Sequence, residues 1–306
     1  MEHHDIYPHR GYRGRLAPSP TGYLHIGHAR TFWTAYERAR QSGGKLVMRM
    51  EDLDEQRSQP EFADAALEDL RWLGIRWDEG PDVGGRFGPY VQSRRGVHYL
   101  DAWKLLLRLG KIYPCSCSRK DIEAAVAAPH EGGSIAADEQ DDEPIYPGTC
   151  RKYHRVVAQI AGSRARQLEE PEGLTWRFIV PSSEIIEFED ANLGKQRFVA
   201  GRDFGDFVVW RRDGTPSYQL ACVVDDAAMQ VTEVVRGADL LKSTARQILL
   251  NRALGYVNPS WYHCRLLVDD KGKRLAKRND ALSLRALREL GLSPEYVVSA
   301  EVPMEA

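Results

Sequence analysis

Two histidines lie three residues apart where a strand gives way to a helix. Residues 18–28 read PSPTGYLHIGH, with His25 and His28 on either side of Gly27. Residues three apart share one face of a helix, so both rings are expected at the helix start. A helix N-terminus also offers unpaired N–H groups and a positive dipole end, which suit phosphate. The string predicts a nucleotide site, where Gly27 leaves room for a flat ring such as adenine.

Cysteines form a second group with chemical potential. The chain has five, and three fall near one another in sequence: Cys115, Cys117 and Cys150. An odd count without a signal peptide argues against a disulfide framework. Three soft ligands are one short of the four that structural zinc prefers.

The fourth ligand has three candidates, namely Tyr146, His130 and His154. Imidazole is a far commoner zinc ligand than a phenol, and the spacing from Cys150 to His154 is plausible. Composition alone therefore favours His154. The alternative to a zinc site is three unligated cysteines near a surface loop.

The first half of the chain alternates strands and helices that would position these groups. Pro, Gly and apolar periodicity predict strands at 12–17 and 45–50 and helices at 27–41, 61–73 and 96–109. Strand–helix–strand order is typical of a parallel sheet with crossover helices.

The second half is predicted to be strand-rich over residues 175–236. A strand at 231–235, a helix at 240–254 and one short final helix at 283–290 follow from the same signals. Residues 138–143 are an acidic run, which indicates a solvated loop.

Bulk composition sets broad limits. Lys plus Arg total 42 against 44 for Asp plus Glu, so net charge does not reveal a polyanion partner and does not exclude one. No apolar run is long enough for a membrane span, and the polar N-terminus is not a signal peptide. A cytoplasmic monomer without a membrane partner is expected.

The string at 18–28 resembles the HIGH motif of class I aminoacyl-tRNA synthetases, and residues 15–22, RLAPSPTG, are similar to the glutamyl subgroup. The resemblance extends through 49–54, 224–226 and 235–240, and so covers about residues 12–290. It implies a ligase that binds ATP and Mg²⁺ and activates glutamate as its adenylate, with His25, Gly27 and His28 at ATP.

The resemblance also assigns a glutamate site. Arg15 and Arg236 would face the two carboxylates, for which the planar guanidinium is well suited. Glu51 would accept the α-ammonium group. The remaining residues of the site are Ala17, Ser19 and Tyr218. From the residues alone, Tyr218 could instead be a core tyrosine, and Cys222, where the subgroup often carries asparagine, is interpreted as packing.

Residues 270–278 form a basic stretch, DKGKRLAKR. On its own, this stretch could equally be a solvated surface loop. Beside the first motif it resembles the family's KMSKS loop, with Lys277 at the second lysine. Arg274 replaces the first lysine and Ala276 the serine, so one hydroxyl is lost. His25, His28 and Lys277 would be catalytic through positive charge and hydrogen-bond donors at the phosphates.

For zinc, the resemblance favours Tyr146 over His154. Short paralogues of the glutamyl synthetases carry a Cys-x-Cys…Tyr-x₃-Cys site, and the spacing of Cys115, Cys117, Tyr146 and Cys150 matches it. A closed shell of four ligands would be structural, since it leaves no open position for catalysis.

The expected fold is α/β: a class I synthetase Rossmann-like parallel sheet with a zinc-bearing insertion and a small C-terminal acceptor-side module. The predicted boundaries are 1–111 and 156–256 for the catalytic parts, 112–155 for the zinc-binding insertion with the acidic loop, and 257–306 for the KMSKS-like loop and helical module, with no anticodon-binding domain expected.

This layout resembles paralogues that transfer glutamate to queuosine in the anticodon loop of tRNA(Asp). Two alternatives stay open: a truncated glutamyl-tRNA synthetase that charges the 3′ end of tRNA(Glu), and an inactive tRNA-binding module.

Overall fold

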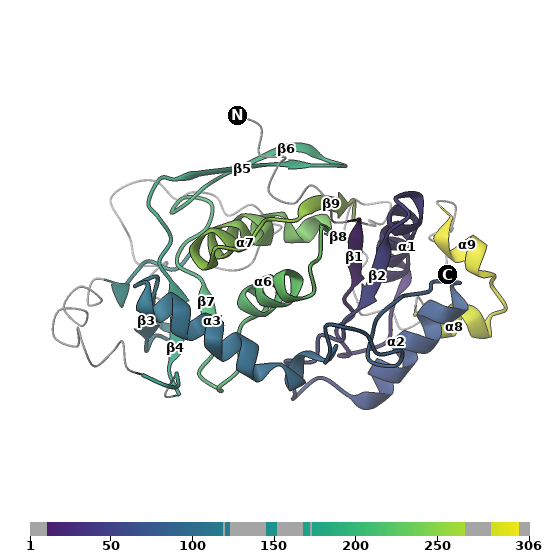
Figure 1. Cartoon of the computed structure of the whole chain (residues 1–306), viewed down its shortest axis with the longest axis horizontal. Coiled ribbons are helices and arrows are strands. Elements are labelled where there is room, and N and C mark those ends of the chain that lie inside the picture. The colour runs from purple at the N-terminus through teal and green to yellow at the C-terminus, as the bar shows by residue number, and fades with distance from the viewer. Residues whose placement is uncertain are drawn as a thin grey trace.

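A computed structural model describes residues 11–118, 120–122, 145–151, 168–171, 173–266 and 283–299. Four strands lie near its centre (Figure 1): β1 (Arg13–Leu16), β2 (Lys45–Met48), β8 (Glu233–Gly237) and β9 (Ser260–Cys264). β1 pairs with β2 in parallel, and β8 pairs with β9 in parallel. β8 lies beside β1, since the Thr232 N–H donates to Arg13 O at 2.8 Å and Arg15 Nη1 donates to Val235 O at 2.6 Å. The predicted parallel sheet is confirmed.

Two crossover helices accompany this sheet. α1 (Ile26–Gln41) buries an apolar stripe and is capped at its start by His25. Gly43, at φ +58°, follows its end, and left-handed backbone of this kind favours glycine. α2 (Pro60–Trp72) begins with proline, whose missing N–H would have no helical partner at that position.

A second group of elements packs around tryptophans. It consists of η1 (Gln92–Arg94), α3 (Gly96–Arg108), the antiparallel strands β3 (Ile112–Cys115), β4 (Thr175–Phe178) and β7 (Val208–Trp210), and α6 (Tyr218–Ala228). The Trp103 ring packs edge-on against the Trp176 ring, with ring centroids 5.0 Å apart, and its centroid lies 6.4 Å from that of Trp210. Aromatic side chains bury large apolar areas, so this cluster ties the antiparallel strands to α3.

A hairpin extends the parallel sheet beyond β9. β5 (Ile185–Asp190) and β6 (Gly194–Val199) pair antiparallel, and β5 joins β9 in parallel at Asp190 and Trp261. η3 (Ala238–Leu240) and α7 (Leu241–Leu254) connect β8 to β9. The hairpin therefore brings Asp190 next to β9.

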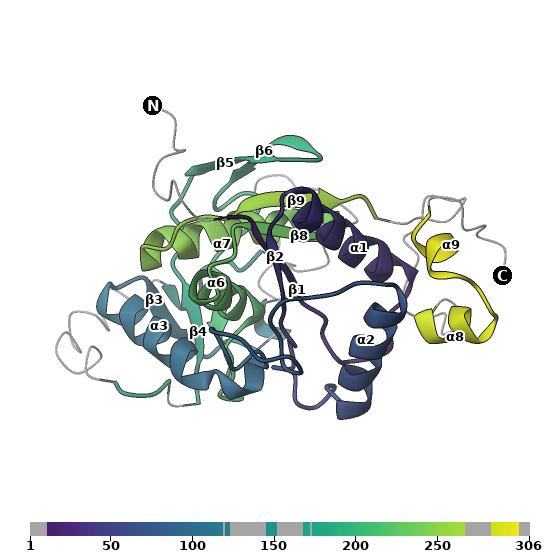
Figure 2. The ribbon, with the colours of Figure 1, turned by 45° about the vertical axis from the view of Figure 1, so that its right-hand side comes forward.

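The last two helices lie at the end of the molecule opposite β3 and β4 (Figure 2). α8 (Leu284–Glu289) and α9 (Pro294–Val298) place Leu284, Leu287 and Val297 in the same apolar cluster as the buried face of α1. The C-terminal helices thus pack on the first half of the chain.

Three sequence predictions need correction. Residues 218–228 form α6, although residues 175–236 were predicted to be strand-rich. A second short helix, α9, follows α8 where only a tail was expected. The strand predicted at 45–50 ends at Met48. The acidic run 138–143 and the basic stretch 270–278 lie outside the described residues.

Within the part of the chain that the structure describes, no helix combines the length and apolar character needed to cross a membrane.

Candidate active site and cysteine cluster

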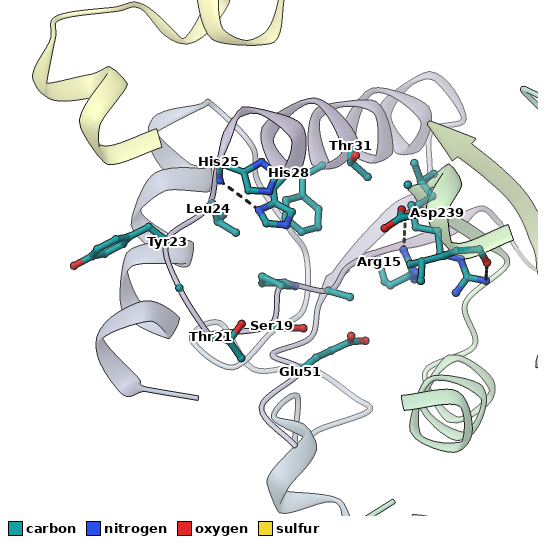
Figure 3. A pocket seen from close by; sticks show the side chains of 18 of the residues that line it. Arg15, Ser19, Thr21, Tyr23, Leu24, His25, His28, Thr31, Glu51 and Asp239 are labelled. Carbon is teal, nitrogen blue, oxygen red and sulfur yellow. Dashed lines mark hydrogen bonds between the residues drawn. The ribbon is translucent and has the colours of Figure 1, made fainter. Parts of the chain in front are cut away.

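A cavity of about 520 Å³ opens where β1 ends and α1 begins (Figure 3). The six residues predicted for glutamate and both predicted histidines line it, although they come from four separate stretches of chain. The lining residues are Arg15, Ala17, Pro18, Ser19, Thr21, Gly22, Tyr23, Leu24, His25, His28, Thr31, Phe32, Glu51, Tyr218, Val235, Arg236, Gly237, Asp239, Leu240 and Ser283. The structure therefore brings these predicted residues together in one place.

The two histidines hold each other at the start of α1. Their rings stack with centroids 3.8 Å apart (Figure 3). His25 Nδ1 accepts from the Gly27 N–H at 3.1 Å, and His28 Nδ1 accepts from the His25 N–H at 3.3 Å. An imidazole nitrogen that accepts carries no proton, so in the neutral rings both protons are on Nε2. This arrangement fixes which ring nitrogen can donate to a phosphate oxygen.

Gly27 has a local reason to be glycine that sequence reasoning missed. A Cβ added there would lie 2.9 Å from His25 Cε1 and 3.1 Å from its Nδ1. Any side chain at Gly27 would therefore push the His25 ring out of its capping position. Gly27 is not among the residues that line the cavity, so close approach of adenine to it remains a prediction.

Arg15 and Arg236 enter the cavity from adjacent strands and are both largely buried. Arg15 Nη1 donates to the Val235 carbonyl at 2.6 Å. Its Nε lies 3.9 Å from Asp226 Oδ1. Two guanidinium groups side by side are suited to an acid with two carboxylates.

Glu51 is one of two carboxylates that line the cavity, the other being Asp239. Its Oε1 accepts from Arg49 Nη2 at 2.9 Å and from Arg49 Nε at 3.3 Å. Cys222, predicted to pack, is indeed buried, and its Sγ also lies 3.6 Å from Glu51 Oε1. The carboxylate is thus fixed from two sides.

Beneath the cavity, Arg49 is the centre of a buried ion network. It has no exposed surface and lies 2.6 Å from Asp226, 2.9 Å from Glu51 and 3.8 Å from Asp225. Burial opposes its charge, but the carboxylates of Asp226, Glu51 and Asp225 outweigh this and raise the pKa of Arg49 well above its usual value.

Asp225 is itself held by three further side chains. Arg95 Nε donates to it at 2.6 Å, and Gln92 Nε2 and Tyr99 Oη both donate at 2.8 Å. Sequence analysis quoted 49–54 and 224–226 only as family-like strings and assigned no role to Arg49, Asp225 or Asp226. Adjacent charges inside an apolar run are the signal that could have marked them as buried and paired.

Tyr218 is the first residue of α6, after the cap residue Ser217. Its side chain is 37% exposed and its Oη lies 3.4 Å from Arg236 Nη1. It lines the cavity, so the alternative of a core tyrosine is wrong.

Lys277, Arg274 and Ala276 lie outside the described residues, but the chain on either side of them is placed. Cys264 pairs with Gly237 at the end of β9. After the gap, Ser283 forms a bridge to His25, and the Leu284 N–H donates to Leu24 O at 2.7 Å. The chain therefore leaves beside Arg236 and returns beside the histidine pair.

The cysteine cluster lies at the far end of the molecule, at the end of β3. The Sγ atoms of Cys115, Cys117 and Cys150 are all within 4.8 Å of one another. Tyr146 Oη is 3.4 Å from Cys115 Sγ and 3.5 Å from Cys117 Sγ. Tetrahedral zinc with sulfur ligands places those sulfurs roughly 3.8 Å apart. The donors and their spacing fit such an ion, while His130 and His154 lie outside the described residues.

A buried arginine lies against this cluster, where it can offset the charge of anionic ligands. Arg177 Nε donates to Cys115 Sγ at 3.3 Å, and its guanidinium stacks over the Tyr146 ring at 3.9 Å. Burial opposes a thiolate at Cys150, but hydrogen bonds from Tyr146 and from the Ser116 backbone outweigh it and lower the pKa of Cys150 to about 6. Burial instead raises the pKa of Cys117 to about 11. A metal binds the thiolate form, so Cys150 is the better prepared of these two cysteines.

Residues 12–302 match the family model of class I tRNA synthetases (E and Q), catalytic domain. The chain belongs to this family. It is 50% identical to the Glutamyl-Q tRNA(Asp) synthetase of Symbiobacterium thermophilum, across 93% of this chain and 84% of that protein. It is 46% identical to the protein of that name from Nitratidesulfovibrio vulgaris, across 92% and 82%.

Longer synthetases are similar over the same part of the chain. Glutamate–tRNA ligase 2 of Alkalilimnicola ehrlichii is 41% identical across 93% of this chain but only 57% of its own length. The crystal structure of a glutamate tRNA ligase from Elizabethkingia meningosepticum in complex with its amino acid superposes with a TM-score of 0.72 and 29% identity. It covers 92% of this chain and 54% of the ligase, so the chain spans about half of these longer synthetases. Class I synthetase membership implies ATP and Mg²⁺.

Proposed function

We propose that the protein activates glutamate with ATP as glutamyl-adenylate and transfers the glutamyl group to queuosine in the anticodon loop of tRNA(Asp). One observation carries the first step: Arg15, Arg236 and Glu51 converge in the same cavity as the histidine pair at the start of α1. These two arginines and this carboxylate, beside a phosphate-binding helix start, match the two carboxylates and the ammonium group of glutamate next to ATP.

In activation, an oxygen of the α-carboxylate of glutamate attacks the α-phosphorus of ATP. The bond from that phosphorus to the bridging oxygen breaks, and pyrophosphate leaves. Negative charge builds on the phosphoryl oxygens, so catalysis is mainly positioning and electrostatic stabilisation. His25 and His28 donate to these oxygens, and Lys277 adds a positive charge. When bound, Mg²⁺ would neutralise charge on the pyrophosphate.

Recognition of glutamate divides among the charged residues of the cavity. Arg15 and Arg236 pair with its carboxylates, and Glu51 accepts from its α-ammonium group. The smaller groups at Ala17 and Ser19, with Tyr218, complete the site. Glu51 is already neutralised by Arg49 in the network below, so the ammonium group meets a carboxylate held in place before binding.

The cysteine cluster is proposed as a structural zinc site with Cys115, Cys117, Tyr146 and Cys150 as ligands. Its part is to hold the 112–155 insertion against the antiparallel sheet. The boundaries 1–111, 112–155, 156–256 and 257–306 are proposed as the functional divisions of a cytoplasmic monomer.

The acceptor is the more specific part of the proposal. Its support is the high identity to two Glutamyl-Q tRNA(Asp) synthetases, matched across more than four-fifths of their length. In transfer, a hydroxyl of queuosine attacks the carbonyl of the adenylate, and AMP leaves. The similarity to Glutamate–tRNA ligase 2 favours the alternative acceptor, the 3′ end of tRNA(Glu).

The test has two stages. Exchange of labelled pyrophosphate into ATP is measured with glutamate, glutamine and aspartate. Glutamate should support exchange at least about tenfold better than aspartate, which leaves one arginine badly paired. Equal exchange with aspartate would reject the amino-acid assignment.

Labelled glutamate is then offered to tRNA(Asp) with and without queuosine, and the terminal nucleotide is removed afterwards. Label that requires queuosine and survives this removal supports the proposed acceptor. Label that is lost with the terminal nucleotide, or that appears equally on tRNA(Glu), establishes the alternative.

A further inference from the structure

Three buried polar side chains join Arg236 in a continuous chain of hydrogen bonds, on the side of Arg236 away from Tyr218. They are Asp190 on β5, His263 on β9 and Thr244 on α7, and Arg236 itself is on β8. None is more than 5% exposed. Asp190, His263 and Thr244 are not among the residues that line the cavity, so any effect on substrate passes through Arg236.

The direction of each hydrogen bond follows from the chemistry of the groups. Asp190 accepts backbone N–H bonds from Asn192 at 3.1 Å and Leu193 at 2.9 Å, as an ionised carboxylate does. His263 Nδ1 lies 2.6 Å from Asp190 Oδ2, and because a carboxylate can only accept, Nδ1 carries the proton. In the neutral ring, Nε2 therefore has the lone pair.

That lone pair points at a group that can only donate. Arg236 Nε donates to His263 Nε2 at 3.2 Å, and Arg236 Nη2 donates to Thr244 Oγ1 at 2.7 Å. Burial and the charge of Arg236 lower the pKa of His263 to about 4, so the ring is neutral at physiological pH. The guanidinium also lies over the Trp261 ring at 5.1 Å.

Two of the three guanidinium nitrogens are thus engaged on the inner side. The third, Nη1, is the one directed toward Tyr218 in the cavity, at 3.4 Å. A guanidinium held at two nitrogens and one face has little rotational freedom, and a carboxylate meeting it loses less energy to ordering.

We propose that His263, oriented by Asp190, and Thr244 are positioning residues that aim Arg236 at the carboxylate of glutamate. The inference rests on the proposed glutamate site. It also gives the β5–β6 hairpin a function, because β5 pairs with β9 at Trp261 and so places the Asp190 carboxylate against His263.

Two substitutions at His263 separate the bond that its Nδ1 makes from the contacts at its Nε2, where Thr244 Oγ1 also lies at 3.0 Å. His263→Asn retains an N–H near Nδ1 for Asp190 but has no acceptor for Arg236. His263→Gln places an amide oxygen near Nε2 for Arg236 but loses the bond to Asp190. Thr244→Val removes the second acceptor. Gln247→Met is the matched control, since Gln247 is buried on the same helix as Thr244.

Pyrophosphate exchange is measured for each variant with glutamate and ATP titrated separately, beside thermal unfolding. His263→Asn and Thr244→Val should raise the KM for glutamate about 10- to 100-fold, as expected for a lost hydrogen bond to a charged group. The KM for ATP should change little. His263→Gln should raise the KM for glutamate less than His263→Asn does, although His263→Gln should unfold at a lower temperature than the wild type. Gln247→Met should have the KM values of the wild type.

A wild-type glutamate KM in His263→Asn and Thr244→Val would overturn the inference. So would parallel increases in both KM values that follow the loss of thermal stability, because a merely structural role predicts that pattern. Failure of the wild-type protein to support pyrophosphate exchange with glutamate would instead reject the proposed function. The wild-type measurement therefore tests the proposed function separately from the role of His263 and Thr244.

Discussion

The cavity and the cysteine cluster both gather groups that cannot remain buried without compensation, but they compensate in different ways. In the cavity, Glu51 is matched by Arg49, and Arg49 by Asp226 and Asp225, all within protein side chains. In the cluster, three sulfurs and a phenol converge with Arg177 as the neighbouring cation. The network beneath the cavity finds its counter-charges among protein side chains, while the cluster presents a donor set suited to a cation.

The two sites also differ in how far apart their residues lie in the sequence. Arg49 and Asp226 are 177 positions apart, so the cavity network forms only when the two halves of the sheet pack together. The cysteine donors lie on one strand end and one nearby loop, within 35 positions of each other. The first site should therefore depend on the core, and the second on its ion.

The largest expected effect comes from breaking the cavity network at its centre. Within the described part of the chain, Arg49→Met removes the ion-pair partner of Glu51 and leaves Asp226 with only Arg15 at 3.9 Å, while Asp225 keeps Arg95. We therefore expect a loss of about 3–5 kcal/mol in the free energy of unfolding. Urea unfolding at neutral pH measures it. Arg57→Met is the matched control, because Arg57 pairs with Asp54 at the surface and should cost under about 1 kcal/mol. Equal losses in the two variants would contradict a compensating role for Arg49.

Lys277 is expected to complete the cavity, with an effect on rate and not on binding. Lys277→Ala should slow pyrophosphate exchange about 10²- to 10³-fold, because its charge meets the negative charge that develops in the transition state. The KM for glutamate should stay near the wild-type value. An increase in this KM at unchanged kcat would instead place Lys277 at ground-state binding.

At the cysteine cluster, substitution should act through metal content. Elemental analysis of the purified protein should find one zinc per chain, and Cys115→Ser and Tyr146→Phe should each lose most of it, since each removes one of four ligands. His154→Ala should retain it. Full zinc in Tyr146→Phe together with loss in His154→Ala would show that the imidazole is the fourth ligand.

The sequence predicted the site best where one short string of residues both determines the local structure and carries the chemical groups. The string at 18–28 marks both the start of α1 and the histidine pair that caps it, and Arg15, Glu51 and Arg236 meet in the cavity as the resemblance implied. α6 was missed because every residue from Leu220 to Asp226 is buried, and a short, largely apolar run of this kind can belong to a buried strand as well as to a helix.

Other features had no local signal at all. The pairing of Arg49 with Asp226, and of Asp190 with His263, joins distant positions that only the folded sheet brings together. α9 is different, because Ser293 followed by Pro294 is a recognisable helix start that the analysis overlooked.

The smallest predicted effect concerns a buried carboxylate that lacks what the cavity network provides. Asp69, on α2, has no exposed surface, and neither carboxylate oxygen has a hydrogen-bond partner among the residues that the structure describes. Burial raises the pKa of Asp69 from 3.8 to about 6, and the charges of Arg285 and Arg288 offset this only in part.

The sign of the pH effect follows from this upward shift. Below pH 3.8 the carboxyl is protonated in both the folded and unfolded states, and it costs nothing. As the pH rises from 3.8 to about 6, the folded state binds more protons than the unfolded state, so stability falls, and above about 6 the full cost is present. Asp69→Asn removes the charge and should gain about 1–2 kcal/mol at pH 7.5, with the gain vanishing near pH 4. Urea unfolding midpoints at the two pH values measure this, and Asp64→Asn, exposed on the same helix, should show no such difference. A gain that is the same at both pH values would show that the Asp69 carboxyl is not the group that titrates, because a pH-independent gain can only come from packing or from the unfolded chain.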